Sequence, residues 1–254
     1  MSCPLEVLPV QGLPEIAAGD PLGELIARRL ASAGVEPAAD DIVAVAQKAV
    51  SKAEGRVRAL EDVAPGRKAR RLAKRLGKDP RLVELILSES RRTVRAERDL
   101  LVVETLSGWI CANAGIDASN VRGADRVTLL PEDSDASARR IRAEIGAAAG
   151  VRPAVLISDS FGRPWRLGQA DVAIGCAGLA PLDDWRGRRD HEGRKLAATV
   201  VAVADEVAAA ADLVRGKDTG VPACLVRGLG RFVSAEDGVG ACAIQRPEAV
   251  DLFR

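Results

Sequence analysis

Residues 154–157, with the sequence AVLI, form an apolar run of strand length that ends abruptly in the polar triplet Ser158-Asp159-Ser160. A short apolar run bounded by polar residues predicts a strand buried in the core of a sheet. Other runs with the character of strands are residues 42–46, 100–104, 110–112, 171–176 and 222–226. The chain must therefore fold around a sheet of short strands, and one buried strand must lead directly into polar side chains.

Segments typical of helices lie between these strands. Asp20 as N-cap and Pro21 at the first helical position predict a helix over residues 22–34. Further helices are expected at residues 67–77, 80–90, 134–149 and 193–214. Because strands and helices mix without a regular β-α-β alternation, we expect an α+β fold with a mixed sheet. No linker rich in Pro, Gly or Ser divides the sequence, so residues 1–254 are expected to form a single domain.

Composition excludes several classes of protein. Hydrophobic residues make up 47% and charged residues 29% of the 254, which is typical of a globular chain rather than a disordered one. The 37 basic and 36 acidic residues leave a net charge of +1, so we expect no nucleic-acid partner and no attraction to an anionic membrane. The basic segment 67–78 lacks the aromatic residues of an RNA-binding surface and is interpreted as a solvated helix face.

The sequence indicates a cytoplasmic protein. No apolar stretch reaches the roughly 18 residues that a membrane span needs, and the N-terminus lacks the basic and apolar regions of a secretory signal. The five cysteines are widely spaced and form no CxxC pair, which is typical of reduced thiols and argues against a zinc site.

Several common catalytic motifs are absent. The sequence contains neither GxxxxGK[ST] nor a GxGxxG between a strand and a helix, so a P-loop and a Rossmann dinucleotide site are not expected. The only histidine, His191, lies in a charged segment, and no GxSxG elbow accompanies it. A metal, if bound, would need oxygen ligands, which favours Mg²⁺, Mn²⁺ or Ca²⁺.

The polar triplet is the first candidate site. Asp159 follows a buried strand directly, a common place for a metal-binding or catalytic carboxylate, and Ser160 offers a hydroxyl ligand. Arg163 and Arg166 follow and could bind phosphates or carboxylates through two hydrogen bonds each. A polar surface loop whose arginines pair with acidic neighbours is an equally good interpretation.

A second candidate follows the apolar residues 109–112. Asp117 could bind a metal and Asn120 a phosphate or sugar, although an Asx-rich turn that satisfies its own backbone explains the same residues. Ser51 and the lysines Lys48 and Lys52 follow the strand at 42–46, where they could bind an anion or simply face solvent.

Nine segments in order along the chain carry a family resemblance. They are GLPEI, QKAVSKAEG, ESRRTVR, ETLSGWICANAGIDASN, LLPEDSDASARRIR, ISDSFGRPWRLGQADVAIG, PLDDWRGRRDHEGRKL, AADLVRGK and PACLVRG. Together they resemble the coenzyme F420-0:L-glutamate ligases, also called coenzyme F420 gamma-glutamyl ligases. The resemblance implies a GTP-dependent enzyme that joins L-glutamate to the deazaflavin precursor coenzyme F420-0 through γ-glutamyl amide bonds, with GDP and phosphate as products. We expect an acyl phosphate intermediate.

The resemblance also implies a fold particular to the family, an intertwined homodimer and a divalent metal, Mg²⁺ or Mn²⁺, as one ion or two. K⁺ is a further candidate. By the same resemblance Asp117 and Asp159 are metal ligands and Ser160 contacts a second metal. Asp159, Arg163 and Arg166 are the expected catalytic residues. The expected GTP-binding residues are Leu13, Pro14, Glu15, Ile16, Ser51, Lys52, Asn120, Gly216 and Lys217.

The sequence departs from the family pattern at one position, Lys217. Two other functions also fit these residues. Members of the family commonly carry an acidic or amide residue in place of Lys217, where it helps to hold the second metal. A nucleotide-dependent ligase that joins an amine to another acid fits the same residues. A flavin- or deazaflavin-binding module without ligase activity would need neither GTP hydrolysis nor metal, and the two aspartates weigh against it.

Overall fold

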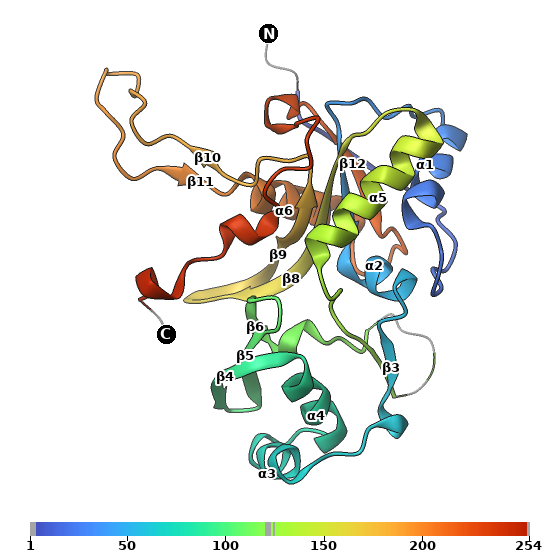
Figure 1. Ribbon diagram of the computed structural model, residues 1–254, viewed down its shortest axis with the longest axis vertical. Coiled ribbons are helices and arrows are strands. Elements are labelled where there is room, and N and C mark those ends of the chain that lie inside the picture. The colour runs from blue at the N-terminus through green and yellow to red at the C-terminus, as the bar shows by residue number, and fades with distance from the viewer. Residues whose placement is uncertain (1–3, 120–122, 124, 253–254) are drawn as a thin grey trace.

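The computed structural model describes residues 4–119, 123 and 125–252, and its centre is a five-stranded mixed sheet (Figure 1). The strands, in spatial order, are β1 (Glu6–Pro9), β12 (Ala223–Arg227), β2 (Ile42–Ala46), β8 (Ala154–Arg163) and β9 (Arg166–Ala177). Only β2 and β8 run parallel, and the other neighbours are antiparallel. The predicted α+β fold with a mixed sheet is therefore confirmed.

Helices cover both faces of this sheet (Figure 1). They are α1 (Leu22–Ser32), α2 (Gln47–Ala53) and α5 (Ser134–Ala149) on one face and α6 (Val203–Arg215) on the other. Along β2, Val43 and Val45 pack toward α1 and α5, whereas Ile42 and Ala44 pack toward α6. Successive side chains of a strand point to opposite faces, so a strand covered on both sides must be apolar at every position.

Residues 57–128 form a lobe below the sheet with a hydrophobic cluster of its own (Figure 1). Its elements are β3 (Val57–Ala59), α3 (Arg67–Leu76), α4 (Pro80–Ser88), β4 (Ser90–Glu97), β5 (Leu100–Thr105), β6 (Ile110–Ala112) and β7 (Arg126–Thr128). The short 3₁₀ helices of the chain are η1 (Leu60–Asp62), η2 (Asn113–Gly115), η3 (Gly230–Phe232), η4 (Ala241–Ile244) and η5 (Glu248–Val250). Helix α3 buries Ala69, Ala73 and Leu76 and exposes its basic residues, as a solvated helix face should.

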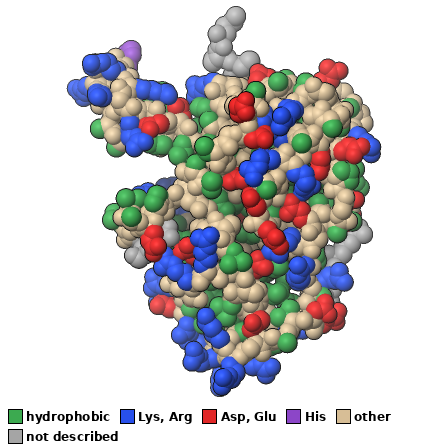
Figure 2. Space-filling model, in the orientation of Figure 1, with side chains coloured by type: hydrophobic (Ala, Val, Ile, Leu, Met, Phe, Trp, Pro, Cys, Tyr) green, Lys and Arg blue, Asp and Glu red, His purple; other side chains and the backbone are tan. Residues whose placement is uncertain are grey.

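A narrow arm protrudes from the sheet between β10 (Asp183–Asp184) and β11 (Val200–Val201), and basic side chains gather on it (Figures 1 and 2). The predicted helix over 193–214 is wrong in its first half, because α6 begins only at Val203. Residues before it pair back along the arm instead: Leu196 donates its N–H to Arg188, and Gly187 donates to Leu196, both at 2.8 Å.

The strand that contains the polar triplet is longer than predicted. Strand β8 does not end at Ile157 but continues to Arg163, because β9 pairs with it along its whole length as an antiparallel hairpin. Ile157 lies opposite Gly175 and Ser158 opposite Ala173, so Ile174 is an extra residue that forms a β-bulge. The expectation that Asp159 and Ser160 lie beyond the strand is therefore wrong: the apolar run stops where β8 leaves the core.

No helix within residues 4–119 and 125–252 is long and apolar enough to cross a lipid bilayer.

The contact between β9 and the start of α5 gives a stability prediction. A β-carbon on Gly175 would lie 2.4 Å from the carbonyl oxygen of Ser134, so Gly175→Ala must push the strand and the helix apart. We expect a loss of about 1–3 kcal/mol in the free energy of unfolding, measured by urea denaturation. The matched control is Gly162→Ala in β8, where no atom lies within 4 Å of the added carbon. Equal stability of the two variants would contradict this packing.

Candidate active site

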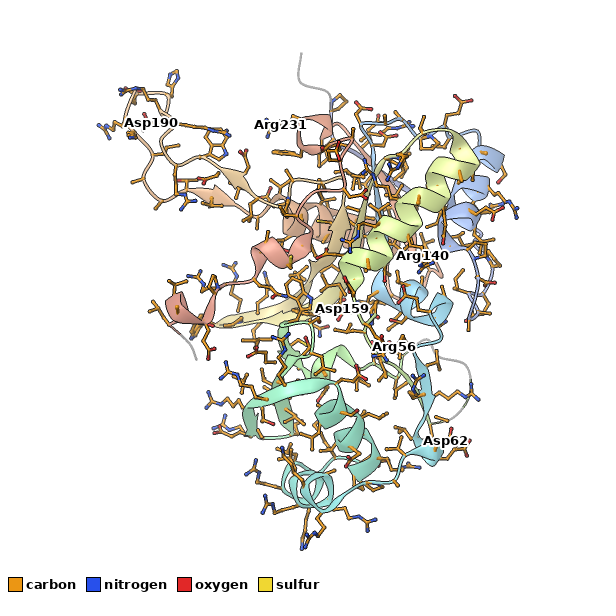
Figure 3. All side chains as sticks on the ribbon, viewed as in Figure 1. Arg56, Asp62, Arg140, Asp159, Asp190 and Arg231 are labelled. Carbon is orange, nitrogen blue, oxygen red and sulfur yellow. The ribbon has the colours of Figure 1, made fainter. Side chains whose placement is uncertain are left out.

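A cleft of about 1530 Å³ lies where the β8–β9 hairpin meets the lobe. Its walls come from the loop before α1, from α2, from β5 and β6, from the hairpin and from the segment after α6. Figure 3 places Asp159 at this junction, between the end of the sheet and the lobe. The cleft therefore joins segments that lie far apart in the sequence.

Asp159 and Asp117 both line the cleft, and their carboxylates differ in environment. Burial opposes the ionisation of Asp117, but Lys48, 2.7 Å away, and the N–H of Ser119 donate to it and hold its pKa below the usual value. Burial raises the pKa of Asp159 to about 7, and the negative charges of Asp171 and Asp117 act in the same direction. Asp117 therefore forms the predicted Asx turn with Ser119 and also places its carboxylate in the cleft, so the two interpretations of this residue are compatible.

Ser158 and Ser160 belong to a polar network on the other side of β8. Their hydroxyls donate to the carboxylate of Asp171 at 2.8 and 2.6 Å. Arg215, at the end of α6, forms an ion pair with Asp171 and donates to Ser158. Asp171 and Arg215 are both buried, whereas Lys217 is exposed and donates to the hydroxyl of Ser160.

Unsatisfied polar atoms mark the cleft as a ligand site. In the described part of the chain, three buried side-chain atoms have no hydrogen-bond partner: Gln47 Nε2, Asn113 Oδ1 and Arg215 Nη1. All three residues line the cleft. Native proteins satisfy nearly all buried polar groups, so such atoms indicate where a ligand completes the hydrogen bonding. The backbone is also strained here, because Ala114, next to Asn113, has a φ of 56°, a left-handed value that alanine seldom adopts.

Most of the residues expected to bind GTP lie in the cleft. Those that line it are Pro14, Glu15, Ile16, Lys52, Gly216 and Lys217. Lys52 forms an ion pair with Glu15 at 2.7 Å. Leu13 packs against the core beside the cleft, and Ser51 is buried and donates to Gln47 at 2.8 Å. Asn120 lies outside the described residues.

The two arginines of the hairpin separate. Arg163 lines the cleft and donates to the carbonyl oxygen of Leu167 at 2.8 Å. Arg166 opens β9 at the exposed tip of the hairpin and is not part of the cleft wall. The tip also exposes Trp165 by 83% and Leu167 by 97%. A ligand held by both arginines together would require the tip to move.

Three residues of the site, Asp171, Arg215 and Asn113, were not predicted from the sequence. Asp171 lies in the middle of β9, directly before its apolar half, and Arg215 is the last residue of α6. The sequence does place a charged residue at the end of an apolar run in both cases, which could have marked each residue as unusual. It could not have shown that the two form a pair, because 44 positions separate them.

The donor set fits a hard divalent cation at Asp117 and Asp159. Among residues 4–119, 123 and 125–252, no group of three or more His, Cys, Asp and Glu side chains is arranged to hold a metal. Mg²⁺ typically uses only one or two protein carboxylates and completes its shell with water and substrate phosphates. Two carboxylates in a cleft lined by lysines are therefore suited to a cation that arrives with a nucleotide.

The raised pKa of Asp159 predicts a pH-dependent stability. Its carboxyl group is protonated more readily in the folded chain than in the unfolded chain, so the folded state loses stability as the pH rises from about 4 toward 7. In EDTA, Asp159→Asn should raise the melting temperature at pH 8, and this gain should shrink toward pH 5. The exposed Asp62→Asn is the control. A gain that does not depend on pH would contradict the assignment.

The chain is similar in sequence to known proteins over nearly its whole length. The sequence model of the family described as F420-0:Gamma-glutamyl ligase matches residues 12–228. The chain is 46% identical over 251 residues to a coenzyme F420:L-glutamate ligase of Methanothermobacter thermautotrophicus, covering 98% of this chain and 99% of the relative. A protein of the same name from Methanopyrus kandleri is 44% identical over 252 residues and 98% of each chain. The chain therefore belongs to the F420-0:gamma-glutamyl ligase family.

Proposed function

We propose that this protein is a GTP-dependent ligase that joins L-glutamate to coenzyme F420-0 through γ-glutamyl amide bonds. The relatives at 46% and 44% identity over nearly their whole length carry the name of that ligase. The cleft supports the proposal through one observation: Asp159 and Asp117 line the same cleft as Lys48 and Lys52, where a metal-bound triphosphate would find both its metal ligands and its cationic contacts.

The reaction proceeds in two steps that need no covalent bond to the enzyme. A carboxylate oxygen of the coenzyme attacks the γ-phosphorus of GTP, the bond from that phosphorus to GDP breaks, and an acyl phosphate forms. The amine of glutamate then attacks the acyl carbon, the bond to phosphate breaks, and the nitrogen loses a proton. The only histidine, His191, lies on the protruding arm, away from the cleft lining, so the cleft acts mainly by electrostatics and positioning.

Each group in the cleft has a role in this scheme. Asp117 and Asp159 hold the cation, and Lys52 and the unpartnered Nη1 of Arg215 face the phosphates. When bound, Mg²⁺ or Mn²⁺ would neutralise negative charge on the phosphates. Arg163 holds an anionic group of the acceptor. K⁺ is a further candidate, which an assay with and without it would check.

The cleft also has an apolar wall that suits a flat ring. Leu100, Val102, Ile110 and Phe161 line it, on β5, β6 and β8. Such a wall supports a substrate that combines an aromatic ring system with anionic groups, as a deazaflavin coenzyme does.

We also propose that the protein is a homodimer in the cytoplasm. Cys111, Cys176, Cys224 and Cys242 are free thiols, which is typical of a reducing compartment. Exposed Trp165 and Leu167 on the hairpin tip support burial against a second copy, because large apolar side chains seldom remain in water together.

A ligase assay tests the activity. The protein is incubated with coenzyme F420-0, L-glutamate, GTP and Mn²⁺, and we expect a mass increase of one or more glutamyl residues that requires both GTP and metal. Asp117→Asn should lower kcat on the order of 100-fold, and Asp62→Asn should not change it. Binding of GTP and coenzyme without a mass increase would instead favour another acid as the acceptor.

Light scattering during gel filtration tests the dimer. Trp165→Glu combined with Leu167→Glu should convert a dimer into a monomer, because the charges would be buried at the interface. Leu5→Glu is the control, since this exposed leucine precedes β1 at the opposite edge of the sheet. A double variant that keeps the mass of the wild type would exclude the hairpin tip from the interface.

A further inference from the structure

The two faces of the polar half of β8 differ in the charged groups that lie on them. Alternation along the strand directs Asp159 to the face that continues Val155 and Ile157, whereas Ser158 and Ser160 point to the face that continues Ala154 and Leu156. On the first face the charge of Asp117 opposes the ionisation of Asp159, and no residue in the described ranges forms an ion pair with Asp159. Asp117 is paired with Lys48, but the two side chains are 23% and 44% exposed, so an arriving cation can displace the lysine into solvent. That face is suited to a divalent cation.

The face of Ser160 is already occupied by protein cations. The hydroxyl of Ser160 donates to Asp171 and receives a hydrogen bond from the ammonium of Lys217. The carboxylate of Asp171 is the acceptor for Ser158, Ser160 and the buried Arg215. A divalent ion at the hydroxyl of Ser160 would have to displace Lys217 and approach the fixed charge of Arg215.

A second metal at Ser160 therefore does not fit the residues of this chain. Hard cations need oxygen ligands with free lone pairs, at about 2.1 Å for Mg²⁺. The hydroxyl of Ser160 is engaged by a donor and an acceptor, and the nearest carboxylate, that of Asp171, is neutralised by Arg215. Both side chains of this ion pair are at most 5% exposed, so Arg215 cannot turn away into solvent as Lys48 can at Asp117. The ammonium of Lys217 already supplies a positive charge at this point of the cleft wall.

We propose that the enzyme uses a single divalent ion, at Asp117 and Asp159, and that the ammonium of Lys217 takes the place of a second ion at Ser160 and binds the nucleoside triphosphate from that side. The inference rests on the proposed function. A lysine is well suited to this role, because its compact ammonium acts as a point charge on phosphate oxygens. Lys217 also follows the last helical residue, Arg215, by only two positions, so the buried ion pair of Arg215 holds the segment in place.

Counting bound Mn²⁺ tests the proposal. Electron paramagnetic resonance or equilibrium dialysis, with Mn²⁺ and a non-hydrolysable GTP analogue, should give one ion per wild-type chain. Lys217→Glu replaces the ammonium by a carboxylate ligand and should bind two ions. The matched control is Lys68→Glu on the exposed face of α3, which should stay at one ion.

Kinetics supply a second readout. The rate of the wild type, plotted against the concentration of Mn²⁺, should follow a hyperbola, as expected for one bound ion. The rate of Lys217→Glu should rise sigmoidally, as expected for two. Lys217→Met should lower kcat on the order of 100-fold, and Lys217→Arg should restore part of it at one ion per chain.

Two ions on the wild type, or one ion on Lys217→Glu, would overturn the inference and leave the ligase proposal intact. A wild type that binds neither Mn²⁺ nor the GTP analogue would overturn both.

Discussion

The buried ion pair between Asp171 and Arg215 is the contact on which the cleft depends. It ties the polar half of the β8–β9 hairpin to the end of α6, and the same carboxylate accepts from Ser158 and Ser160. Removing one partner would leave the other charge buried and unpaired, which typically costs about 3–5 kcal/mol. The pair therefore holds three segments as one rigid wall while the opposite side of β8 stays open to ligands.

This division leaves Asp159 as a carboxylate held for binding rather than for stability. Its neighbours on the cleft side include a second carboxylate, and burial disfavours its charge. A ligand that neutralises the site would recover the stability lost in its absence, because a molecule that binds only the folded chain shifts the folding equilibrium. The ion pair between Asp171 and Arg215 fixes the hairpin next to Asp159, because Asp171 lies opposite Ser160 in the β8–β9 pairing.

Local signals predicted the regular elements well. Helix α5 spans residues 134–149 as predicted, because Asp133 caps its start and Gly150 takes a left-handed conformation at its end. The helix predicted over 193–214 failed in its first half because backbone pairing along the arm overrides helix propensity there. The length of β8 could not be read from its own residues, since its polar half is a strand only because β9 pairs with it.

Site residues were predictable one by one but not as contacts. Asp117, Asp159 and Ser160 stood out as polar residues after apolar runs, and all three line the cleft. The partnership of Asp171 with Arg215 depends on how α6 packs on the sheet, and no spacing in the sequence encodes it. Arg163 and Arg166, three positions apart, looked equivalent, and the hairpin turn between them sends only Arg163 to the cleft wall.

The buried polar atoms that lack a hydrogen-bond partner all point to the same site. Within the described residues, every buried side-chain atom that lacks a hydrogen-bond partner belongs to a residue of the cleft. The left-handed backbone of Ala114, a residue type that seldom adopts that conformation, lies next to the cleft residue Asn113. Proteins satisfy buried polar groups wherever stability alone decides, so unsatisfied atoms gathered in one cleft indicate that ligand binding sets its geometry. The unpaired atoms include donors and an acceptor, Gln47 Nε2, Arg215 Nη1 and Asn113 Oδ1. A ligand that satisfies all of them must itself both accept and donate hydrogen bonds, as a nucleotide does with its phosphates and its base.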